Sequence, residues 1–319
     1  MRRGRVLALI AVAAGAMWFF SGWYGGGPLA KDTAFVVSGG AGLGSVADKL
    51  AADGAISSAS AFKLRARLLG GGGAIKAGEF LLPKGASPAR ILGILRGAEV
   101  IRRFVAVPEG MPSIMVYDRL MAQPLLSGTI AVPAEGSIQP DSYAFDRGDT
   151  RAAVLKRMQA AAARTLAALW AKRGADTVAK TPQEALVLAS IVEKETGKPS
   201  ERPMVAGLYS NRLRQGMMLQ ADPTIIYPIT AGKPLGRRIR QSEIAAVNDY
   251  NTYAMVGLPK GPITNPGKKA IEAVLHPATT DALYMVADGT GGHQFAATLE
   301  EHNANVAKWF AIRRARGEL

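Results

Sequence analysis

A charge-free apolar run near the N-terminus constrains this chain more than any other feature. The run extends from Val6 to Ala30 and follows three arginines. At about 1.5 Å per residue, the segment 6–24 is long enough to cross a bilayer as a helix. Because arginine-rich flanks stay on the cytoplasmic side, we expect residues 1–5 to form a cytoplasmic tail. The chain would then cross the inner (cytoplasmic) membrane once, with its body on the far side.

A cleaved signal peptide is the competing interpretation of this run, because such peptides also combine a basic start with an apolar stretch. The run is long for a signal peptide, and Trp18, Phe19 and Phe20 stand where small residues would mark a cleavage site. Trp18, Trp23 and Tyr24 also suit a membrane–water interface. We therefore expect an uncleaved anchor.

Composition limits what the exported body can bind. The chain of 319 residues has a net charge of +14, or 14 − 3 = +11 without the three N-terminal arginines, and it contains no cysteine. Disulfides and thiol chemistry are therefore excluded. A basic surface would suit nucleic acid, but expected export past a membrane argues against that partner. Anionic lipid head groups or an acidic wall polymer fit better, and a merely solvated basic surface remains the alternative.

Three segments of the N-terminal third repeat one plan of strand, glycine-containing turn and helix. They begin near Phe35, Phe80 and Phe104. The first two resemble a LysM-like module, which we place at 33–100 and which implies contact with a sugar polymer. A purely structural spacer is the alternative. Residues 122–150, rich in proline and glycine, are predicted to be a loop with one ordered turn at 139–143.

The clearest local signals define a buried helix over about 182–196. Thr181 is placed as N-cap, Pro182 as the first helical residue, and Glu184 as the partner in a capping box. Gly197 is a natural C-terminal stop. The interior of this helix is almost wholly apolar, which indicates burial.

Two glutamates end this helix, and helical spacing separates them. Glu195 continues an apolar stripe, whereas Glu193 does not; the stripe is Val187, Leu188, Ile191 and Val192. Burial and the negative end of the helix dipole both raise the pKa of Glu195, which would make it an acid that keeps its proton near neutral pH. We expect Glu193 in solvated or helix-end contacts. A structural glutamate that reaches a buried arginine would produce the same pattern at Glu195.

Polar groups follow this helix in the sequence. A second helix is predicted over 201–215, and Gln220 and Asp222 come directly after it, where they could line a cleft. Asp222 precedes a proline and could instead only form a turn. The later row Tyr250, Asn251 and Tyr253 suits carbohydrate, because rings and amides offer apolar faces and hydrogen bonds together, but it also suits ordinary loop packing.

Two other site classes find little support. The three histidines, His276, His293 and His302, lack the spacing of metal ligands. The glycines at 289, 291 and 292 do not form a phosphate loop, because no helix with a lysine follows them.

Together these motifs resemble the membrane-anchored endolytic murein transglycosylases of the MltG (YceG-like) type. The matching stretches are LASIVEKET (188–196), SERPMVAGLYSNRLRQGMMLQADPTIIY (200–227), YNTYAMVGLPKGPITNPG (250–267), HP (276–277) and LYMVADGTGGHQF (283–295). The resemblance extends from the anchor to the C-terminus and is specific over about 181–303.

The resemblance implies a lyase that cleaves peptidoglycan glycan strands between N-acetylmuramic acid and N-acetylglucosamine and leaves 1,6-anhydromuramyl ends. The family's catalytic glutamate is the second of the Glu-Lys-Glu run, here Glu195. The motif match assigns to the glycan cleft Gln220, Asp222, Tyr227, Asn251, Tyr253 and His293. No cofactor or metal is implied; the partners would be glycan strands, membrane lipid and peptidoglycan synthases. A non-catalytic wall-binding scaffold and a muramidase-type hydrolase that uses Asp222 are the alternatives.

The expected fold is α+β. It comprises the transmembrane helix, the LysM-like module, and a mixed α+β catalytic domain over 101–319 with the catalytic glutamate at the end of a buried helix.

Overall fold

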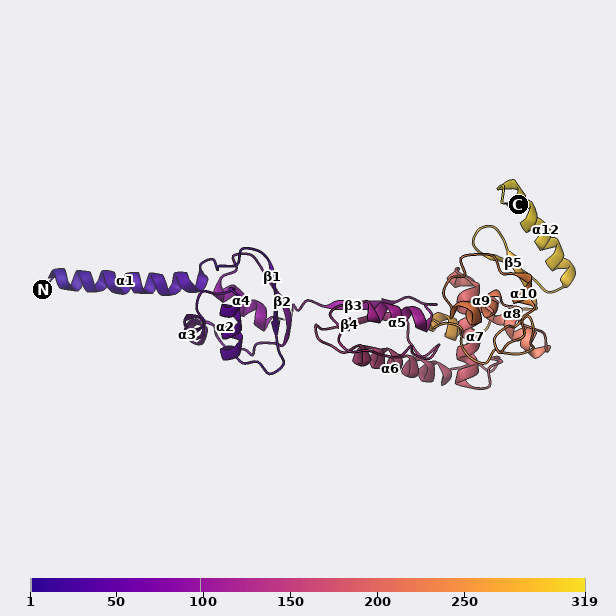
Figure 1. Ribbon diagram of the computed structural model, residues 1–319, viewed down its shortest axis with the longest axis horizontal. Helices are drawn as coiled ribbons and strands as arrows, with labels where there is room; N and C mark the ends of the chain where they lie inside the picture. The colour runs from indigo at the N-terminus through magenta and orange to yellow at the C-terminus, as the bar shows by residue number, and fades with distance from the viewer. Residues whose placement is uncertain (1, 98, 319) are drawn as a thin grey trace. The chain divides into compact units, whose positions relative to one another are not determined.

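The computed structural model describes residues 2–97 and 99–318, and the chain divides into two compact units (Figure 1). Unit 1 comprises residues 1–103 and unit 2 residues 104–319. Helices alternate with short strands that pair into two-stranded sheets. The mixed α+β class predicted from the sequence is therefore confirmed, whereas the LysM-like assignment stays a prediction.

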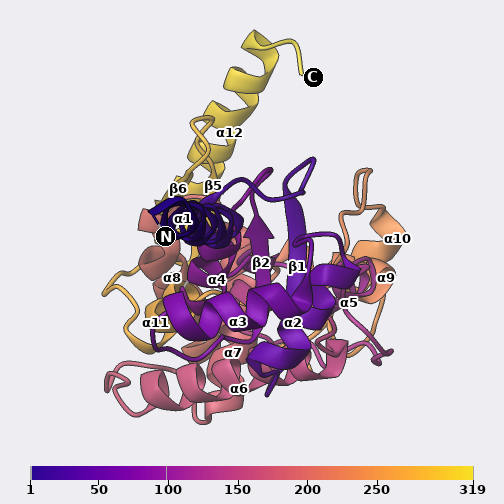
Figure 2. The same ribbon diagram turned by 90° about the vertical axis from the view of Figure 1, so that its left-hand side faces the viewer.

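Unit 1 is built around one antiparallel strand pair. In chain order its elements are α1 (Arg2–Tyr24), β1 (Thr33–Val37), α2 (Leu43–Ala52), α3 (Ala59–Leu69), β2 (Gly78–Leu82) and α4 (Pro88–Arg96). Strands β1 and β2 lie side by side, with α2 and α3 drawn in front of them in Figure 2, and Phe35 pairs with Phe80. Both phenylalanines are fully buried. The pair thus supplies the centre of the core of unit 1.

Helix α1 carries the predicted anchor. In the described part of the chain it is the one helix long and apolar enough to cross a membrane, with a mean hydropathy of 1.9 in the segment Arg5–Tyr24. Its last turn differs from the expectation of an interfacial aromatic belt, because the Trp23 side chain is only 2% exposed. Trp23 packs against Phe62 of α3, with ring centroids 5.7 Å apart. The guanidinium of Arg65 donates to the carbonyl of Gly22 at 3.3 Å. The end of α1 therefore belongs to the core of unit 1.

Unit 2 begins with a second small sheet. Strand β3 (Arg103–Val107) pairs with β4 (Asp141–Phe145), and α5 (Ser113–Met121) lies between them in sequence. The sequence predicted only an ordered turn at 139–143, so the strand β4 is a correction. Pairing with β3, which lies far away in the sequence, stabilises this segment as a strand.

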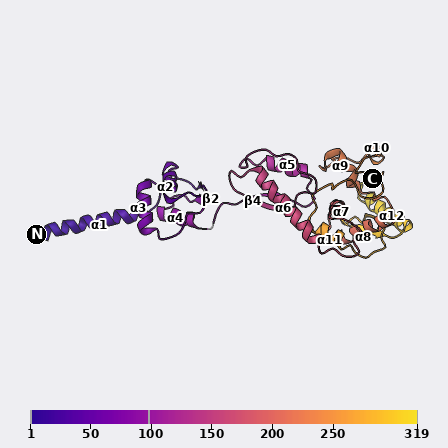
Figure 3. The same cartoon turned by 90° about the horizontal axis from the view of Figure 1, so that it is seen from below.

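The rest of unit 2 surrounds one buried helix. Its elements are α6 (Arg151–Trp170), α7 (Pro182–Glu195), the 3₁₀ turn η1 (Pro199–Glu201), α8 (Arg202–Arg214), α9 (Asp222–Thr230), α10 (Gln241–Ile244), α11 (Lys268–Leu275), β5 (Tyr284–Ala287), β6 (His293–Ala296) and α12 (Leu299–Ala315). Helix α7 contacts α6, α8, α9 and α11, and the long helix α6 reaches α11 (Figure 3). All residues of α7 from 185 to 192 are buried.

Local chemistry explains where α7 starts. Thr181 accepts a hydrogen bond from the backbone N–H of Glu184 at 3.1 Å, as the sequence predicted. The carboxylate of Glu184 accepts from the backbone N–H of Lys180 at 2.6 Å, one residue before the N-cap, in place of the predicted capping box. The helix ends at Glu195, with Thr196 as an extended C-cap. Glu193 and Glu195 therefore lie at the C-terminal end of a buried helix.

Candidate active site

Glu195 lies at the C-terminal end of α7 with its carboxyl group turned into protein. Its Oε1 atom is buried and has no hydrogen-bond partner among the described residues. The hydroxyl of Tyr209, a fully buried residue of α8, interacts with the same carboxyl group. A buried carboxyl oxygen without a partner is costly unless a proton or a ligand satisfies it.

The surroundings of Glu195 raise its pKa to about 7. Burial is the main cause; the nearby carboxylate of Asp222 adds to it, while the Tyr209 hydroxyl and the charge of Arg212 act in the opposite direction. Glu195 can therefore hold a proton at neutral pH and release it to a basic oxygen. These are the properties required of a general acid.

Glu193, two residues earlier, is held in a structural network. Its side chain is 5% exposed and meets the guanidinium of Arg202 at 2.9 Å. It also accepts a hydrogen bond from the backbone N–H of Gly267, at the start of α11, at 2.9 Å. The expected solvated contacts are therefore wrong, because α8 and α11 cover this side chain. The glutamate that reaches a buried arginine is Glu193, whereas Glu195 forms no ion pair within residues 2–97 and 99–318.

Arg212 of α8 forms one wall beside Glu195 and is 7% exposed. Its Nε donates to the carbonyl of Leu283 at 2.6 Å, and its Nη1 donates to the carbonyl of Leu219 at 2.8 Å. These bonds join α8 to the segment before α9 and to the start of β5. The buried cation is thus fixed by backbone carbonyls.

A buried pair of threonines positions Asp222 and Tyr253. The hydroxyls of Thr224 and Thr252 lie 2.9 Å apart, and Thr252 accepts from the backbone N–H of Ala221 at 3.0 Å. This contact holds the start of α9 against residues 251–253. As a result the hydroxyl of Tyr253 donates to the Asp222 carboxylate at 2.6 Å.

One cleft of about 400 Å³ is lined by Glu195, Tyr209, Arg212, Asp222 and Tyr253. Of the residues predicted from the sequence, it brings together Glu195, Gln220, Asp222, Tyr253 and His293. The cleft falls within the usual range of pockets that hold small ligands, about 300–1,000 Å³. Its walls combine a buried acid, a carboxylate, a cation and tyrosine rings, as a polar ring-shaped ligand such as a sugar would require.

Two predicted residues lie outside this lining. Asn251 is fully buried, and its amide donates to the carbonyls of Glu243, Ile244 and Ala246 at 2.7 to 3.3 Å. It therefore shapes the loop and has no exposed surface for a ligand. The ring of Tyr227 packs against that of Tyr250, with centroids 4.8 Å apart.

Four polar residues of the lining were not predicted from the sequence to belong to the site. They are Tyr209, Arg212, Tyr284 and His302. The rings of Tyr284 and His302 stack at 5.2 Å, and burial, helped by the charge of Arg212, lowers the pKa of His302. The motif LYMVADGTGGHQF contains Tyr284 and could have indicated it.

Burial raises the pKa of two other carboxyl groups of unit 2, those of Glu193 and Glu135. Burial raises the pKa of Glu135 to about 7, although hydrogen bonds from Ser113 oppose this. Its Oε1 accepts from the backbone N–H of Ser113 at 2.9 Å and from the amide of Asn265 at 3.3 Å. Glu135 therefore joins three segments and lies outside the cleft lining.

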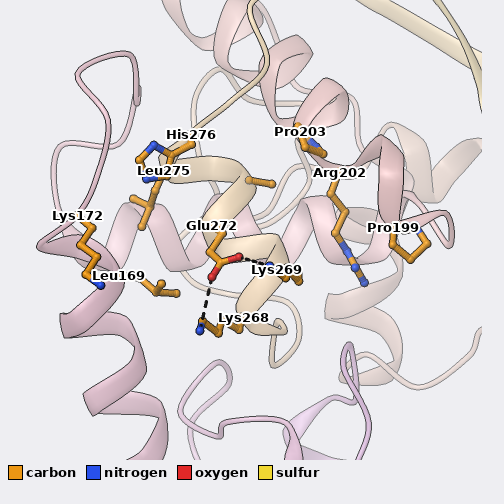
Figure 4. A pocket seen from close by; sticks show the side chains of 11 residues that line it. Leu169, Lys172, Pro199, Arg202, Pro203, Lys268, Lys269, Glu272, Leu275 and His276 are labelled. Carbon is orange, nitrogen blue, oxygen red and sulfur yellow. Dashed lines mark hydrogen bonds and ion pairs between the residues drawn. The ribbon is translucent and has the colours of Figure 1, made fainter.

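A separate groove of about 630 Å³ lies among the ends of α6, α8 and α11 (Figure 4). Three of its cations form ion pairs: Lys268 and Lys269 share Glu272, at 3.7 and 2.8 Å, and Arg202 pairs with Glu193. No buried acid lines it. The cleft at Glu195 is accordingly the better candidate for chemistry.

Comparison with known proteins assigns the chain that carries this cleft to a family. The family model described as YceG-like matches residues 35–308. The chain belongs to this family. The membership predicted from the motifs is confirmed, and the matched segment includes every residue of the cleft.

Relatives with assigned names point in the same direction. An endolytic murein transglycosylase of Bacillus subtilis (strain 168) is 34% identical over 182 residues, which cover 57% of this chain and 49% of the relative. An endolytic murein transglycosylase of Streptococcus pneumoniae serotype 2 is 35% identical over 180 residues, covering 54% of this chain and 32% of that protein. The chain thus spans about half or less of these curated relatives.

A solved structure shares the fold over most of the chain. The crystal structure of a YceG-like protein from Listeria monocytogenes superposes with a TM-score of 0.55 at 25% identity, and covers 86% of this chain and 98% of that protein. The fold of this chain is therefore similar to that of a solved YceG-like protein.

Proposed function

We propose that the chain is an endolytic murein transglycosylase that cleaves peptidoglycan glycan strands between N-acetylmuramic acid and N-acetylglucosamine. The single observation that carries the proposal is Glu195, a buried acid with one unpartnered oxygen, set in a polar cleft. Its pKa of about 7 provides the proton that cleavage of a glycosidic bond requires. Two relatives with the name endolytic murein transglycosylase support the choice of substrate.

The reaction uses Glu195 twice. Its carboxylic acid gives a proton to the glycosidic oxygen, and the N-acetylglucosamine part leaves with a free hydroxyl. The muramyl C6 hydroxyl attacks C1, and the resulting carboxylate of Glu195 takes the hydroxyl proton. The product is a 1,6-anhydromuramyl end. Because the nucleophile belongs to the substrate, the paired carboxylates of an ordinary glycosidase are unnecessary, and the route needs no metal or cofactor.

Other cleft groups bind and orient the glycan. Gln220 and Tyr253 offer an amide and a hydroxyl at the wall of the cleft, and Asp222 helps to keep Glu195 protonated. Such cleavage within strands would terminate or trim newly made glycan, which makes peptidoglycan synthases natural partners.

Helix α1 serves as an uncleaved membrane anchor in this proposal, with the N-terminus in the cytoplasm and both units outside. Its hydropathy and length support a membrane span. Burial of Trp23 in the core of unit 1 also favours the anchor, because cleavage near residue 25 would remove this side chain from the core. N-terminal sequencing of membrane-extracted protein tests this; a mature start near residue 25 would reject it.

Glycan end chemistry tests the activity. Full-length protein in detergent is incubated with purified murein sacculi, and the released fragments are analysed by mass spectrometry. Anhydro ends from the parent and none from Glu195→Gln are expected. Glu135→Gln is the matched control, because Glu135 has a similar pKa but lies outside the cleft, and it should cleave like the parent.

The other outcomes separate the alternatives. Reducing ends alone would show a muramidase-type hydrolase that uses water, with Asp222 as the partner carboxylate. Absence of cleavage by every variant would favour a non-catalytic wall-binding scaffold. Full activity in Glu195→Gln would show that the acid is another group.

A further inference from the structure

The segment η1 contributes a buried carboxylate that the proposed reaction does not use. Glu201 is 9% exposed. Its Oε2 accepts a hydrogen bond from the hydroxyl of Thr196 at 3.2 Å and lies 2.8 Å from Nδ1 of His293. Its Oε1 accepts from the backbone N–H of His293 at 3.1 Å. One side chain thus joins the residue that follows Glu195 to the first residue of β6, 92 positions after Glu201.

The chemistry of this contact determines which nitrogen of His293 carries a proton. Burial would raise the pKa of Glu201, but the hydrogen bonds from His293 and Thr196 outweigh it, and the pKa is lowered. An ionised carboxylate only accepts hydrogen bonds, so Nδ1 of His293 must be the donor. In the neutral imidazole, Nε2 then carries a lone pair.

The position of the His293 ring determines where the lone pair of Nε2 points. His293 lines the cleft that contains Glu195. Since the Nδ1 edge of the ring faces Glu201, the opposite edge with Nε2 is the one available to the cleft. Nε2 has no hydrogen-bond partner among residues 2–97 and 99–318.

Gly292, directly before His293, allows the backbone to pass close to the Glu201 carboxylate. A Cβ atom at Gly292 would lie 2.3 Å from Oε1 of Glu201 and 3.1 Å from the carboxylate of Asp288. Any side chain there would push against the Glu201 carboxylate. The last glycine of GTGGHQF, for which no phosphate-loop role was found, therefore makes room for this contact.

We propose that Glu201 is a positioning residue that holds His293 in the Nδ1-protonated form, so that Nε2 faces the cleft as a hydrogen-bond acceptor for a sugar hydroxyl. The proposal rests on the proposed function for the identity of the ligand. A carboxylate that orients an imidazole in this way fixes both its tautomer and its ring angle. Through Thr196 the same carboxylate also aligns the cleft wall with the end of α7.

Glu201→Gln tests the proposal with two independent measurements on the full-length protein in detergent. The amide can donate to Nδ1, so the proton should move to Nε2, and NMR of isotope-labelled histidine nitrogens should show this switch. The chain has only three histidines, which simplifies the assignment. Cleavage of sacculi should fall by about 10- to 100-fold, as when carboxylates that orient metal-bound imidazoles are removed. His293→Gln should lose a similar factor, and the double variant should lose little more.

Controls separate the possible failures. Glu272→Gln changes another glutamate of unit 2, one that pairs with lysines in the groove of Figure 4, and should leave both readouts unchanged. If Glu201→Gln does not fold, Gly292→Ala displaces the carboxylate while keeping its charge and should perturb the same histidine signal. An unchanged tautomer, or a switched tautomer with unchanged cleavage, would overturn the proposal. If the parent does not cleave sacculi, the proposed function fails, yet the NMR result still decides the role of Glu201.

Discussion

Replacing Glu195 with glutamine should abolish cleavage and, above neutral pH, make the protein more stable. The pKa of this carboxyl group is raised from 4.5 to about 7. The folded state therefore binds the proton more tightly than the unfolded state. Its stabilising effect is fully present below pH 4.5 and is lost as the pH rises through about 7. Each pKa unit corresponds to about 1.4 kcal/mol, so ionised Glu195 costs up to about 3 kcal/mol at pH 8.

The assay compares thermal unfolding of the parent and Glu195→Gln at pH 4.5 and pH 8. Glutamine resembles the protonated acid and cannot ionise, so the two proteins should unfold at similar temperatures at pH 4.5. At pH 8 the variant should unfold roughly 6–12 °C higher, since about 1 kcal/mol shifts the melting temperature of a domain of this size by about 2–4 °C. Cleavage by the parent should fall as the pH rises through about 7, because the acid loses its proton. An identical pH dependence of stability in both proteins would refute the assignment of Glu195 as a buried acid.

Three further substitutions test how the cleft is built. Glu193→Ala removes one of the two carboxylates that pair with Arg202, since Glu109 also meets it at 3.1 Å, and leaves the buried N–H of Gly267 without its acceptor. It should lower the free energy of unfolding by about 1–3 kcal/mol, measured by denaturant titration; an effect near zero would show that the ion pair is dispensable. Gly207→Ala places a Cβ atom 2.5 Å from the carbonyl of Ala278 and should cost about 1–3 kcal/mol in the same titration, whereas an unchanged midpoint would mean that α8 can shift freely. Thr252→Val leaves buried polar partners unsatisfied and should cost about 1–3 kcal/mol and reduce cleavage; intact activity would contradict its role in placing the start of α9.

The sequence predicted most of what local chemistry decides. The Thr181 cap and the apolar interior defined α7 to within a residue, because both signals depend on neighbours along the chain. Helix α9 was not predicted, since Asp222 before a proline suggests a turn equally well. Packing against residues 251–253 stabilises it as a helix.

Less of the site could be predicted from the sequence, because the roles of its polar residues depend on partners that lie far away along the chain. Helical spacing placed Glu195 on the apolar stripe, but it did not indicate the burial of Glu193, which depends on Arg202 of α8 and on Gly267 directly before α11. Asn251 seemed suited to carbohydrate, yet three backbone carbonyls use its amide. No pattern in the sequence indicated that Arg212 would be buried at the cleft, since an arginine on a helix usually faces solvent.

The buried Trp23 has a consequence for how the protein would stand on a membrane. A flexible linker between a membrane helix and the following domain lets the domain take many orientations. In this protein the last turn of α1 is itself a part of the core of unit 1. A change in the tilt of α1, for instance in a thicker bilayer, would rotate unit 1 by the same angle. If α1 is the proposed anchor, the thickness of the bilayer would therefore set the orientation of unit 1 relative to the lipid surface.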